Sequence, residues 1–275
     1  APGVAGLEPH GPAEPGGAGL EPRGPRAPER VCYSRYAVRT CVWDGGARGA
    51  APLEAILYRR APEPERAHSL DVGDDLGQGR ALHLYLPHFA SAEDLPGDSL
   101  ALALQGLGPR LPDLGGAAPR ALYALDVRGL GECAPDEEGS FWGPYGMDYM
   151  AHGYAGLLGE TLLGWRVMDV LSAIDLLVAE GAPTDAEGLM GDGGPRVRLV
   201  GRGQGAVLAA FAALLHPAVS GVTLKNAPLS YLAWARAPLV DWPAANIAPG
   251  ALQELDLPEL YACVEWCDDC NWPYL

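Results

Sequence analysis

The sequence predicts an α/β fold in which a mostly parallel β-sheet carries helices on both faces. Strand-like and helix-like segments alternate from about residue 80 onward, which is the order that parallel sheets require. The helical segment that follows "VRLVGRGQG" (197–205) is apolar nearly all round, so we expect it to be buried. The chain is 48% hydrophobic and 20% charged over 275 residues, a balance that can form a substantial core.

The first thirty residues differ in composition from the rest. Residues 1–30 are rich in Pro and Gly, and "AGLEPHGP" at 5–12 recurs as "AGLEPRGP" at 18–25. Such a segment buries too little apolar surface to offset its ordering entropy. We therefore predict a flexible arm over 1–30 and one α/β domain over 31–275. The chain starts with alanine and shows no signal peptide, so we expect a processed chain or part of a larger one and leave its compartment open.

Six short segments, bounded by Gly, Pro or polar residues, are predicted as strands. In chain order they are 31–43, 52–60, 81–87, 121–127, 197–200 and 221–230. The first two are close together, which predicts an antiparallel pair at the start of the sheet. A further segment, 98–108, fits a helix or a strand.

Helical periodicity is strongest over 163–178, where apolar residues recur at three- and four-residue spacing. Gly181 and Pro183 end this helix. Residues 131–159 are rich in glycines, aromatic residues and acids without a clear period, so we predict a long loop there. The last part of the chain mixes helix with Pro-rich loop.

The turn Gly201-Arg202-Gly203-Gln204-Gly205 is the most informative motif. An elbow of the form G-x-S-x-G places a nucleophilic serine between a strand and a helix, and its outer glycines avoid collisions with both. Here Gly201 and Gly205 are kept, whereas the middle position is Gly203. The steric pattern is present without the nucleophile. We expect the backbone N–H of Gln204 to point into an oxyanion hole.

A second interpretation of the same turn is a phosphate-binding loop. Gly201, Gly203 and Ala206 fit the dinucleotide fingerprint G-x-G-x-x-G/A, and Lys225 after the next strand could favour the 2′-phosphate of NADP. That fingerprint normally opens the first βαβ unit of its domain, whereas here several strands precede it. A third interpretation is a tight turn without function. We expect no cofactor and keep NADP or nucleotide binding as an alternative.

Two motifs together resemble the α/β-hydrolase superfamily. "ALYALDVRGLGE" (121–132) resembles its D-x-R-G-x-G-x-S segment, with Glu132-Cys133 where that segment often ends in serine. "GRGQGAVLAAFAAL" (201–214) is similar to the G-x-S-Q-G-G elbow and helix of acetylxylan esterases and dienelactone-hydrolase-like enzymes, and "SGVTLKNAPLS" (220–230) to their next strand. The likeness runs from about residue 80 to 262 and implies an α/β-hydrolase-like fold.

The catalytic residues of that superfamily are not all present. Its enzymes use a serine, an acid and a histidine in that chain order. The resemblance implies that the acid and the histidine follow two later strands, which this sequence does not show, so we expect a sheet without its last strands. The only histidine after the elbow is His216, at the far end of the elbow helix. Serine-triad catalysis is therefore expected to be lost.

Other residues could support a different mechanism. Asp148 and His152 are four residues apart, a spacing at which an acid–base pair can form. His88 follows the strand that supplies part of the oxyanion hole in the superfamily. Either histidine could activate water, and the alternative is a structural, hydrogen-bonded histidine. Three aromatic residues could stack on a sugar ring or only anchor the long loop: Trp142, Tyr145 and Tyr149.

Charge and cysteine content exclude some classes of partner. The net charge of −16, with a single lysine, would repel phosphate backbones, so we expect no nucleic-acid partner. No apolar run is long enough to span a bilayer, so we expect no membrane partner. Cys263, Cys267 and Cys270 have a spacing that zinc or an iron–sulfur cluster could use, yet without a nearby histidine we predict no metal. Cys32 and Cys41 could pair in an oxidising compartment.

These observations lead to three hypotheses about function. The first is a relative of acetylxylan and other carbohydrate esterases without serine-triad catalysis, which binds a carbohydrate or small ester. The second is an active ester hydrolase with a non-serine mechanism. The third is a nucleotide-binding protein.

Overall fold

The computed structural model describes residues 33–39, 54–60, 82–106, 122–134, 147–181, 196–240 and 242–264. The chain divides into two units, Ala1–Val31 and Cys32–Leu275, and all described residues belong to the second. Several predictions concern residues outside the described ranges: the flexible arm over 1–30, the Cys32–Cys41 pair, Trp142, Tyr145, Cys267 and Cys270.

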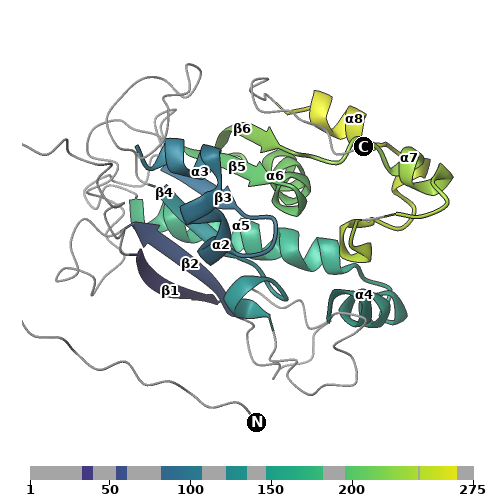
Figure 1. Ribbon diagram of the computed structural model, residues 1–275, viewed down its shortest axis with the longest axis horizontal. Coiled ribbons are helices and arrows are strands. Elements are labelled where there is room, and N and C mark those ends of the chain that lie inside the picture. Colours follow the sequence, from purple (N-terminus) through teal and green to yellow (C-terminus); the bar gives the residue numbers. More distant parts are fainter. Residues whose placement is uncertain are drawn as a thin grey trace, which may run out of the picture. The chain divides into compact units, whose positions relative to one another are not determined.

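Six strands form one sheet in the order β1-β2-β4-β3-β5-β6 (Figure 1). They are β1 (Tyr33–Arg39), β2 (Glu54–Arg60), β3 (Leu82–Leu86), β4 (Leu122–Asp126), β5 (Val197–Arg202) and β6 (Val219–Lys225). Strand β2 is antiparallel to both β1 and β4, whereas β4, β3, β5 and β6 run parallel to one another. The predicted antiparallel start and the mostly parallel sheet are both confirmed.

The described helices are α2 (Ser91–Gly97), α3 (Ser99–Leu104), α4 (Met147–Leu157), α5 (Leu162–Gly181), α6 (Gln204–Leu215), α7 (Tyr231–Arg236) and α8 (Leu257–Ala262). Three single turns of 3-10 helix accompany them: η2 (Gly131–Cys133), η4 (Ala244–Asn246) and η5 (Ala251–Gln253). The two long predicted helices are present as α5 and α6. Within the described ranges, no helix combines the length and the hydropathy needed to cross a membrane.

The segment 98–108, which fits either structure by sequence, begins as helix α3. The Asp98 side chain accepts hydrogen bonds from the backbone N–H groups of Leu100 (2.9 Å) and Ala101 (3.1 Å). A carboxylate in this position satisfies amides that have no partner within the first turn, and so it fixes where the helix starts.

The prediction of a loop over 131–159 is wrong for the second half of that range, because residues 147–157 form helix α4. Ala155 of this helix is buried, and its half-buried residues, Asp148, Met150, Ala151 and His152, include one large apolar side chain. Tyr149, Tyr154 and Leu157, by contrast, are more than half exposed. The helix therefore lacks the apolar stripe that periodicity detects.

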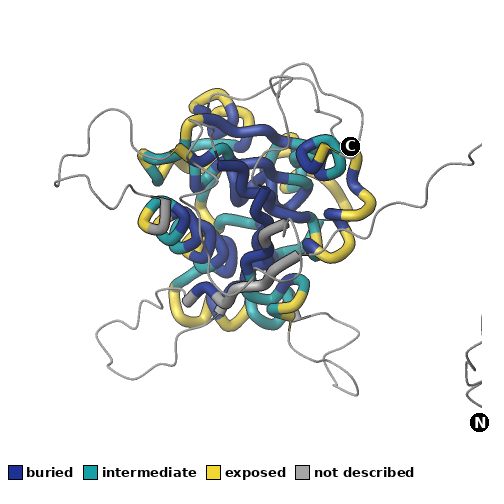
Figure 2. The backbone as a smooth tube through the Cα atoms, turned by 90° about the vertical axis from the view of Figure 1, so that its left-hand side faces the viewer, coloured by how far each residue is buried: buried dark blue, intermediate teal, exposed yellow. Residues whose placement is uncertain are grey.

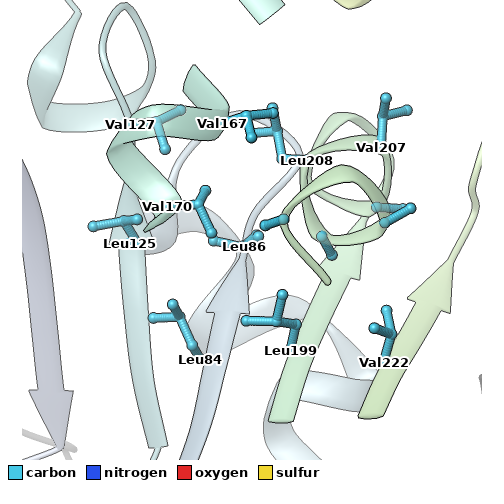
Figure 3. Close-up of a cluster of buried hydrophobic side chains, with 14 of the residues drawn as sticks. Leu84, Leu86, Leu125, Val127, Val167, Val170, Leu199, Val207, Leu208 and Val222 are labelled. Carbon is cyan, nitrogen blue, oxygen red and sulfur yellow. The ribbon is translucent and has the colours of Figure 1, made fainter. Parts of the chain in front are cut away.

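The two faces of the sheet are covered by different helices, since successive side chains of a strand point to opposite faces. The larger cluster packs under α5 and α6 and includes Leu84, Leu86, Leu125, Val170, Leu199, Val207 and Val222 (Figure 3). The smaller packs under α2 and α3 and includes Tyr85, Leu95, Leu100, Leu104, Leu122, Ala124 and Val200. Buried segments lie in the middle of these layers, and the exposed ones lie outside (Figure 2). Strands β3, β4 and β5 end at one edge of the sheet, where ligands bind in open α/β folds.

The exit of β4 is held by one fully buried carboxylate. Asp126 accepts hydrogen bonds from Ser91 N (2.8 Å), Tyr58 Oη (3.0 Å) and Glu132 N (3.0 Å). The backbone at Gly131 lies close to this carboxylate. A Cβ on Gly131, whose φ is +51°, would lie 2.0 Å from Asp126 Oδ2. This contact explains the second glycine of the D-x-R-G-x-G segment.

Gly131→Ala should destabilise the fold more than Gly159→Ala, although both glycines have positive φ (+51° and +75°). Nothing lies within 4 Å of a Cβ at Gly159, so only the backbone cost of about 1 kcal/mol is expected there. At Gly131 the collision with Asp126 adds to that cost, for a total of about 2–4 kcal/mol. Urea unfolding of the two variants measures the difference, and equal losses would contradict the role given to Asp126.

Candidate functional site

The glycine-rich turn forms a tight elbow between β5 and α6. Strand β5 ends at Arg202, α6 begins at Gln204, and Gly203 between them has φ +58° and ψ −115°. The Gly203 N–H donates to the backbone carbonyl of Lys225 at 2.8 Å, which ties the turn to the end of β6. The positive φ suits glycine, since it strains any residue with a Cβ.

The outer glycines of the elbow are required by close packing of backbone on backbone. A Cβ on Gly201 would lie 2.4 Å from the carbonyl oxygen of Gly205. A Cβ on Gly205 would lie 2.1 Å from the carbonyl oxygen of Leu86, at the end of β3. The start of α6 is therefore pressed against β5 and β3 at once. The steric reason that the sequence suggested for these glycines holds in the structure.

The imidazole of His88 occupies the space next to the middle position of the elbow. A Cβ on Gly203 would lie 2.2 Å from His88 Nδ1 and 2.8 Å from its Cγ. The Gln204 backbone N–H, expected to point into an oxyanion hole, donates to His88 Nδ1 at 3.1 Å. The Gln204 side chain also donates from Nε2 to the His88 carbonyl at 3.0 Å. The elbow thus contains a histidine ring where the resemblance implies a serine side chain.

These contacts fix the protonation state of His88. Burial is the main cause that lowers the pKa of the imidazole below its usual value of about 6.5, and the positive charge of Arg202 lowers it further. The carboxylate of Asp94 acts in the opposite direction. Because Nδ1 accepts a hydrogen bond, the neutral ring must carry its proton on Nε2.

The backbone around His88 is positioned by Asp94, at the start of α2. This carboxylate is 5% exposed, and it accepts hydrogen bonds from the His88 N–H (3.0 Å) and Tyr85 Oη (3.1 Å). Arg202, next to the elbow glycine, forms an ion pair with the same carboxylate and a second one with Asp98 (3.3 Å). The positive charge beside the elbow is therefore neutralised by protein carboxylates.

Two aromatic rings flank the His88 imidazole. The ring of Phe89, which is 51% exposed, lies 4.0 Å from it at an angle of 56°, and the ring of Trp242 meets it edge-on at 5.8 Å. Trp242 in turn stacks on Trp234 of α7 at 5.7 Å. We call Phe89, His88, Trp242 and Trp234 the aromatic row. It joins the end of β3 to the segment that follows β6.

A buried polar network connects the elbow to α4 and α5. The guanidinium of Arg166, which is 1% exposed, pairs with both carboxylate oxygens of Asp148 (2.5 and 3.2 Å) and donates to the Arg128 carbonyl (2.9 Å). Its Nη1 also lies 3.4 Å from Gln204 Oε1, which accepts from Asn246 Nδ2 at 3.2 Å. One glutamine side chain thus connects α4, α5, η4 and the elbow.

The structure does not bring the predicted residues into one acid–base pair. Asp148 pairs with Arg166, and no hydrogen bond between Asp148 and His152 occurs among the described residues. His152 Nδ1 is shielded from solvent and has no partner within the described ranges. His88 alone of the predicted histidines lies at the elbow. Catalytic roles for the three residues stay predictions.

His216 and Lys225 are engaged elsewhere. His216 Nε2 lies 3.0 Å from Asp175 Oδ1, and His216 Nδ1 accepts from Ala218 N at 3.1 Å, so both ring nitrogens are used at the far end of α6. Lys225 Nζ contacts Asp98 Oδ2 at 2.6 Å, so the charge that could favour the 2′-phosphate of NADP is already paired with a protein carboxylate. Among the described residues, no group of three or more His, Cys, Asp or Glu side chains could hold a metal.

Several site residues are not identifiable from the sequence. Arg166 falls on the polar side of the predicted helix 163–178 and reads as a solvent-exposed residue, yet it is buried beneath α4. Asn246 and Trp242 lie in a Pro-rich region without periodicity. The sequence gives one signal for Gln204, because it directly follows the middle position of the elbow motif.

Comparisons with known proteins concern the fold only. No protein-family profile and no curated protein sequence matches the chain. Among solved structures, the chain is similar to a Bacteroides fragilis protein named as an acetyl xylan esterase (12% identity, TM-score 0.47, 83% of this chain and 59% of that chain). It is also similar to an esterase from Pyrococcus furiosus (11%, TM-score 0.40, 74% and 54%) and to an Agrobacterium vitis protein named as a hydrolase (15%, TM-score 0.38, 72% and 54%).

The chain spans about half the length of these solved structures. Its α/β-hydrolase-like fold rests on its own features: the mostly parallel sheet, helices on both faces, and the elbow between β5 and α6.

Asp148→Asn should destabilise the protein by about 3 kcal/mol, since it leaves the buried charge of Arg166 without its partner. This is the low end of the range for such pairs, because the Asp148 side chain is 21% exposed. The matched control is Asp175→Asn, whose side chain is 77% exposed against His216 and should cost less than about 1 kcal/mol. The free energies of unfolding can be measured by chemical denaturation. Equal losses in the two variants would contradict the role given to the Arg166–Asp148 pair.

Stability should fall below about pH 6.5 in the wild type relative to His88→Asn, whose amide oxygen can still accept from Gln204 without titrating. The folded-state pKa of His88 is lowered, so below pH 6.5 the unfolded chain binds a proton that the folded chain does not. The stabilisation is therefore present above pH 6.5 and decreases as the pH falls. Unfolding free energies measured from pH 7.5 to 5 should diverge, and parallel curves would exclude a buried neutral imidazole.

Proposed function

We propose that this chain is related to acetylxylan and other carbohydrate esterases, lacks serine-triad catalysis, and binds a carbohydrate or small ester at its elbow. The observation that carries the proposal is the position of His88, whose Nδ1 lies 2.2 Å from where a Gly203 side chain would begin. The nucleophile is absent, and the space that it would need is filled.

Acyl transfer through an elbow requires a nucleophile, a base that takes its proton, and amides that bind the oxyanion. Gly203 has no side chain. The Gln204 N–H, the amide that would bind the oxyanion, is hydrogen-bonded to His88. His216, the histidine that follows the elbow, is hydrogen-bonded through both ring nitrogens at the far end of α6. Each of the three requirements is therefore unmet within the described residues.

His88 is also poorly suited to act as a base on water. A general base needs a free lone pair within reach of the proton that it abstracts. The lone pair of Nδ1 is occupied by the Gln204 N–H, and Nε2 carries the proton. In this arrangement the imidazole can donate a hydrogen bond but cannot remove a proton from water.

The aromatic row supports a ligand with a sugar ring or an apolar group. Aromatic faces provide large contact areas and favourable stacking geometry for such ligands. Phe89 is half exposed beside His88, and Trp242 and Trp234 continue the row at ring distances of 5.8 and 5.7 Å. Bulky apolar side chains that remain exposed near a functional site commonly mark a binding surface.

A second candidate function is ester hydrolysis with His152 as a base. The observation in its favour is that His152 Nδ1 is shielded from solvent and lacks a partner within the described ranges. Against it, Asp148 is bound to Arg166 rather than oriented toward His152. The two candidates differ in whether the protein turns over an ester.

The wild-type chain should not accelerate the hydrolysis of an aryl acetate or of acetylated xylan above the rate of matched controls. Gly203→Ser should be equally inactive, because its Cβ would meet the His88 ring and the Nδ1 lone pair of that ring already accepts from the Gln204 N–H. Isothermal calorimetry should nevertheless detect binding of acetylated xylo-oligosaccharides.

His152→Ala tests the second candidate, and His216→Ala, which removes a histidine at the far end of α6, is its matched control. Turnover that disappears in His152→Ala but survives in His216→Ala would overturn the proposal in favour of the non-serine hydrolase. Absence of both turnover and binding would refute the ligand-binding part.

A further inference from the structure

We propose that the Nε2–H of His88 is the group that recognises the ligand, and that it binds the carbonyl oxygen of a neutral ester such as an O-acetyl group. In a serine elbow the backbone amide after the nucleophile contacts the substrate carbonyl. Here the Gln204 amide donates to Nδ1 of His88. The group that is left to donate to a ligand is the Nε2–H on the other side of the imidazole, one ring width farther from the amide. The inference rests on the proposed function and specifies the ligand chemistry of the same site.

The first support is that Nε2 is available. Within the described ranges His88 makes its side-chain hydrogen bond through Nδ1 alone, to Gln204 N. His88 Nε2 is not among the solvent-shielded side-chain atoms that lack a partner, so it reaches solvent. Among the described residues it is therefore a donor without an acceptor at the surface of the elbow. The predicted His152 differs, because its unpartnered nitrogen is shielded.

The second support is that the ring is held in one tautomer and one orientation. Gln204 binds His88 twice, from its backbone N–H to Nδ1 (3.1 Å) and from its side-chain Nε2 to the carbonyl (3.0 Å). Asp94 holds the His88 N–H at 3.0 Å. A hydrogen bond accepted at Nδ1 withdraws electron density from the ring, which makes the Nε2–H a stronger donor. The conformational entropy of the His88 side chain is therefore lost when the protein folds, and ligand binding does not have to offset it.

The third support is the charge around the ring, which favours a neutral acceptor over an anion. Among the described residues, the charged groups that act on His88 are Arg202 and Asp94. Arg202 is ion-paired with Asp94 and Asp98, so it offers no free positive charge to a carboxylate or a phosphate. The net charge of the chain, −16, repels anions further. An ester carbonyl accepts a hydrogen bond without this penalty.

The rings beside His88 fit the rest of such a ligand. The rings of Phe89 and Trp242 lie 4.0 and 5.8 Å from the imidazole, and together they provide apolar contact for an acetyl methyl group or a sugar face. Apolar neighbours also lower the local dielectric constant, which strengthens a hydrogen bond made between them.

The test is nitrogen-15 NMR of the histidine rings of the full chain, titrated with acetylated xylobiose, unacetylated xylobiose and sodium acetate. The free protein should show His88 in the Nε2–H tautomer, as the Gln204 contact requires. Acetylated xylobiose should shift the Nε2 resonance of His88 and leave that of His216 unchanged. Neither unacetylated xylobiose nor the acetate anion should reproduce the shift.

Two variants provide a second readout by calorimetry. His88→Phe keeps a flat ring but removes the donor, and it should weaken binding of acetylated xylobiose about three- to tenfold, the worth of one hydrogen bond. His216→Phe removes a histidine outside the site and should bind like the wild type.

An Nδ1–H tautomer of His88, or an Nε2 resonance that does not respond to acetylated xylobiose, would overturn the inference. Equal affinity of His88→Phe and the wild type would also overturn it, and it would leave the proposed ligand-binding function intact. Ester turnover by the wild type would instead contradict the proposed function, whatever the tautomer of His88.

Discussion

The site depends on one buried glutamine. Gln204 is 1% exposed, and its backbone and side chain together contact His88, Arg166 and Asn246. Through Arg166 the network reaches Asp148 on α4, so elements that are far apart in the chain share one set of hydrogen bonds. A buried polar network of this kind is costly when any member is unsatisfied, and it therefore specifies a single arrangement. Gln204 fixes the orientation of the imidazole directly, and it is connected to α4 only through the Arg166–Asp148 pair.

The fold was accessible from the sequence because its signals are local. The strands at 82–86, 122–126 and 197–202 are short apolar runs between turn residues, and α5 repeats its apolar positions at helical spacing. The elbow glycines could be interpreted because two of them contact backbone atoms of neighbouring elements, a requirement that only glycine meets. Helix α4 was not predicted because its covered positions mix Asp148 and His152 with Met150 and two alanines and so form no apolar stripe.

The site is much harder to predict from the sequence than the fold, because its contacts join positions that are distant in the chain. His88 and Gln204 are separated by 116 residues, and Arg166 and Asp148 by 18. No spacing rule connects such pairs, so the sequence indicates neither the Asp148–Arg166 ion pair nor the burial of Arg166. The importance of His88 could be guessed from its position after β3. The entry of the His88 ring into the elbow could not be predicted, because the ring occupies space that is open only when residue 203 has no side chain.

The filled elbow also has an evolutionary consequence. A change of Gly203 to serine would introduce a Cβ 2.2 Å from His88 Nδ1, at a residue whose φ is +58°. The replacement of His88 by a residue that cannot accept a hydrogen bond would leave the Gln204 amide without its acceptor. A serine at position 203 is therefore unfavourable while His88 is unchanged, and an apolar residue at position 88 is unfavourable while the Gln204 amide needs an acceptor. The identity of residue 203 is thus coupled to that of residue 88, so a change at either position is tolerated only with an accommodating residue at the other.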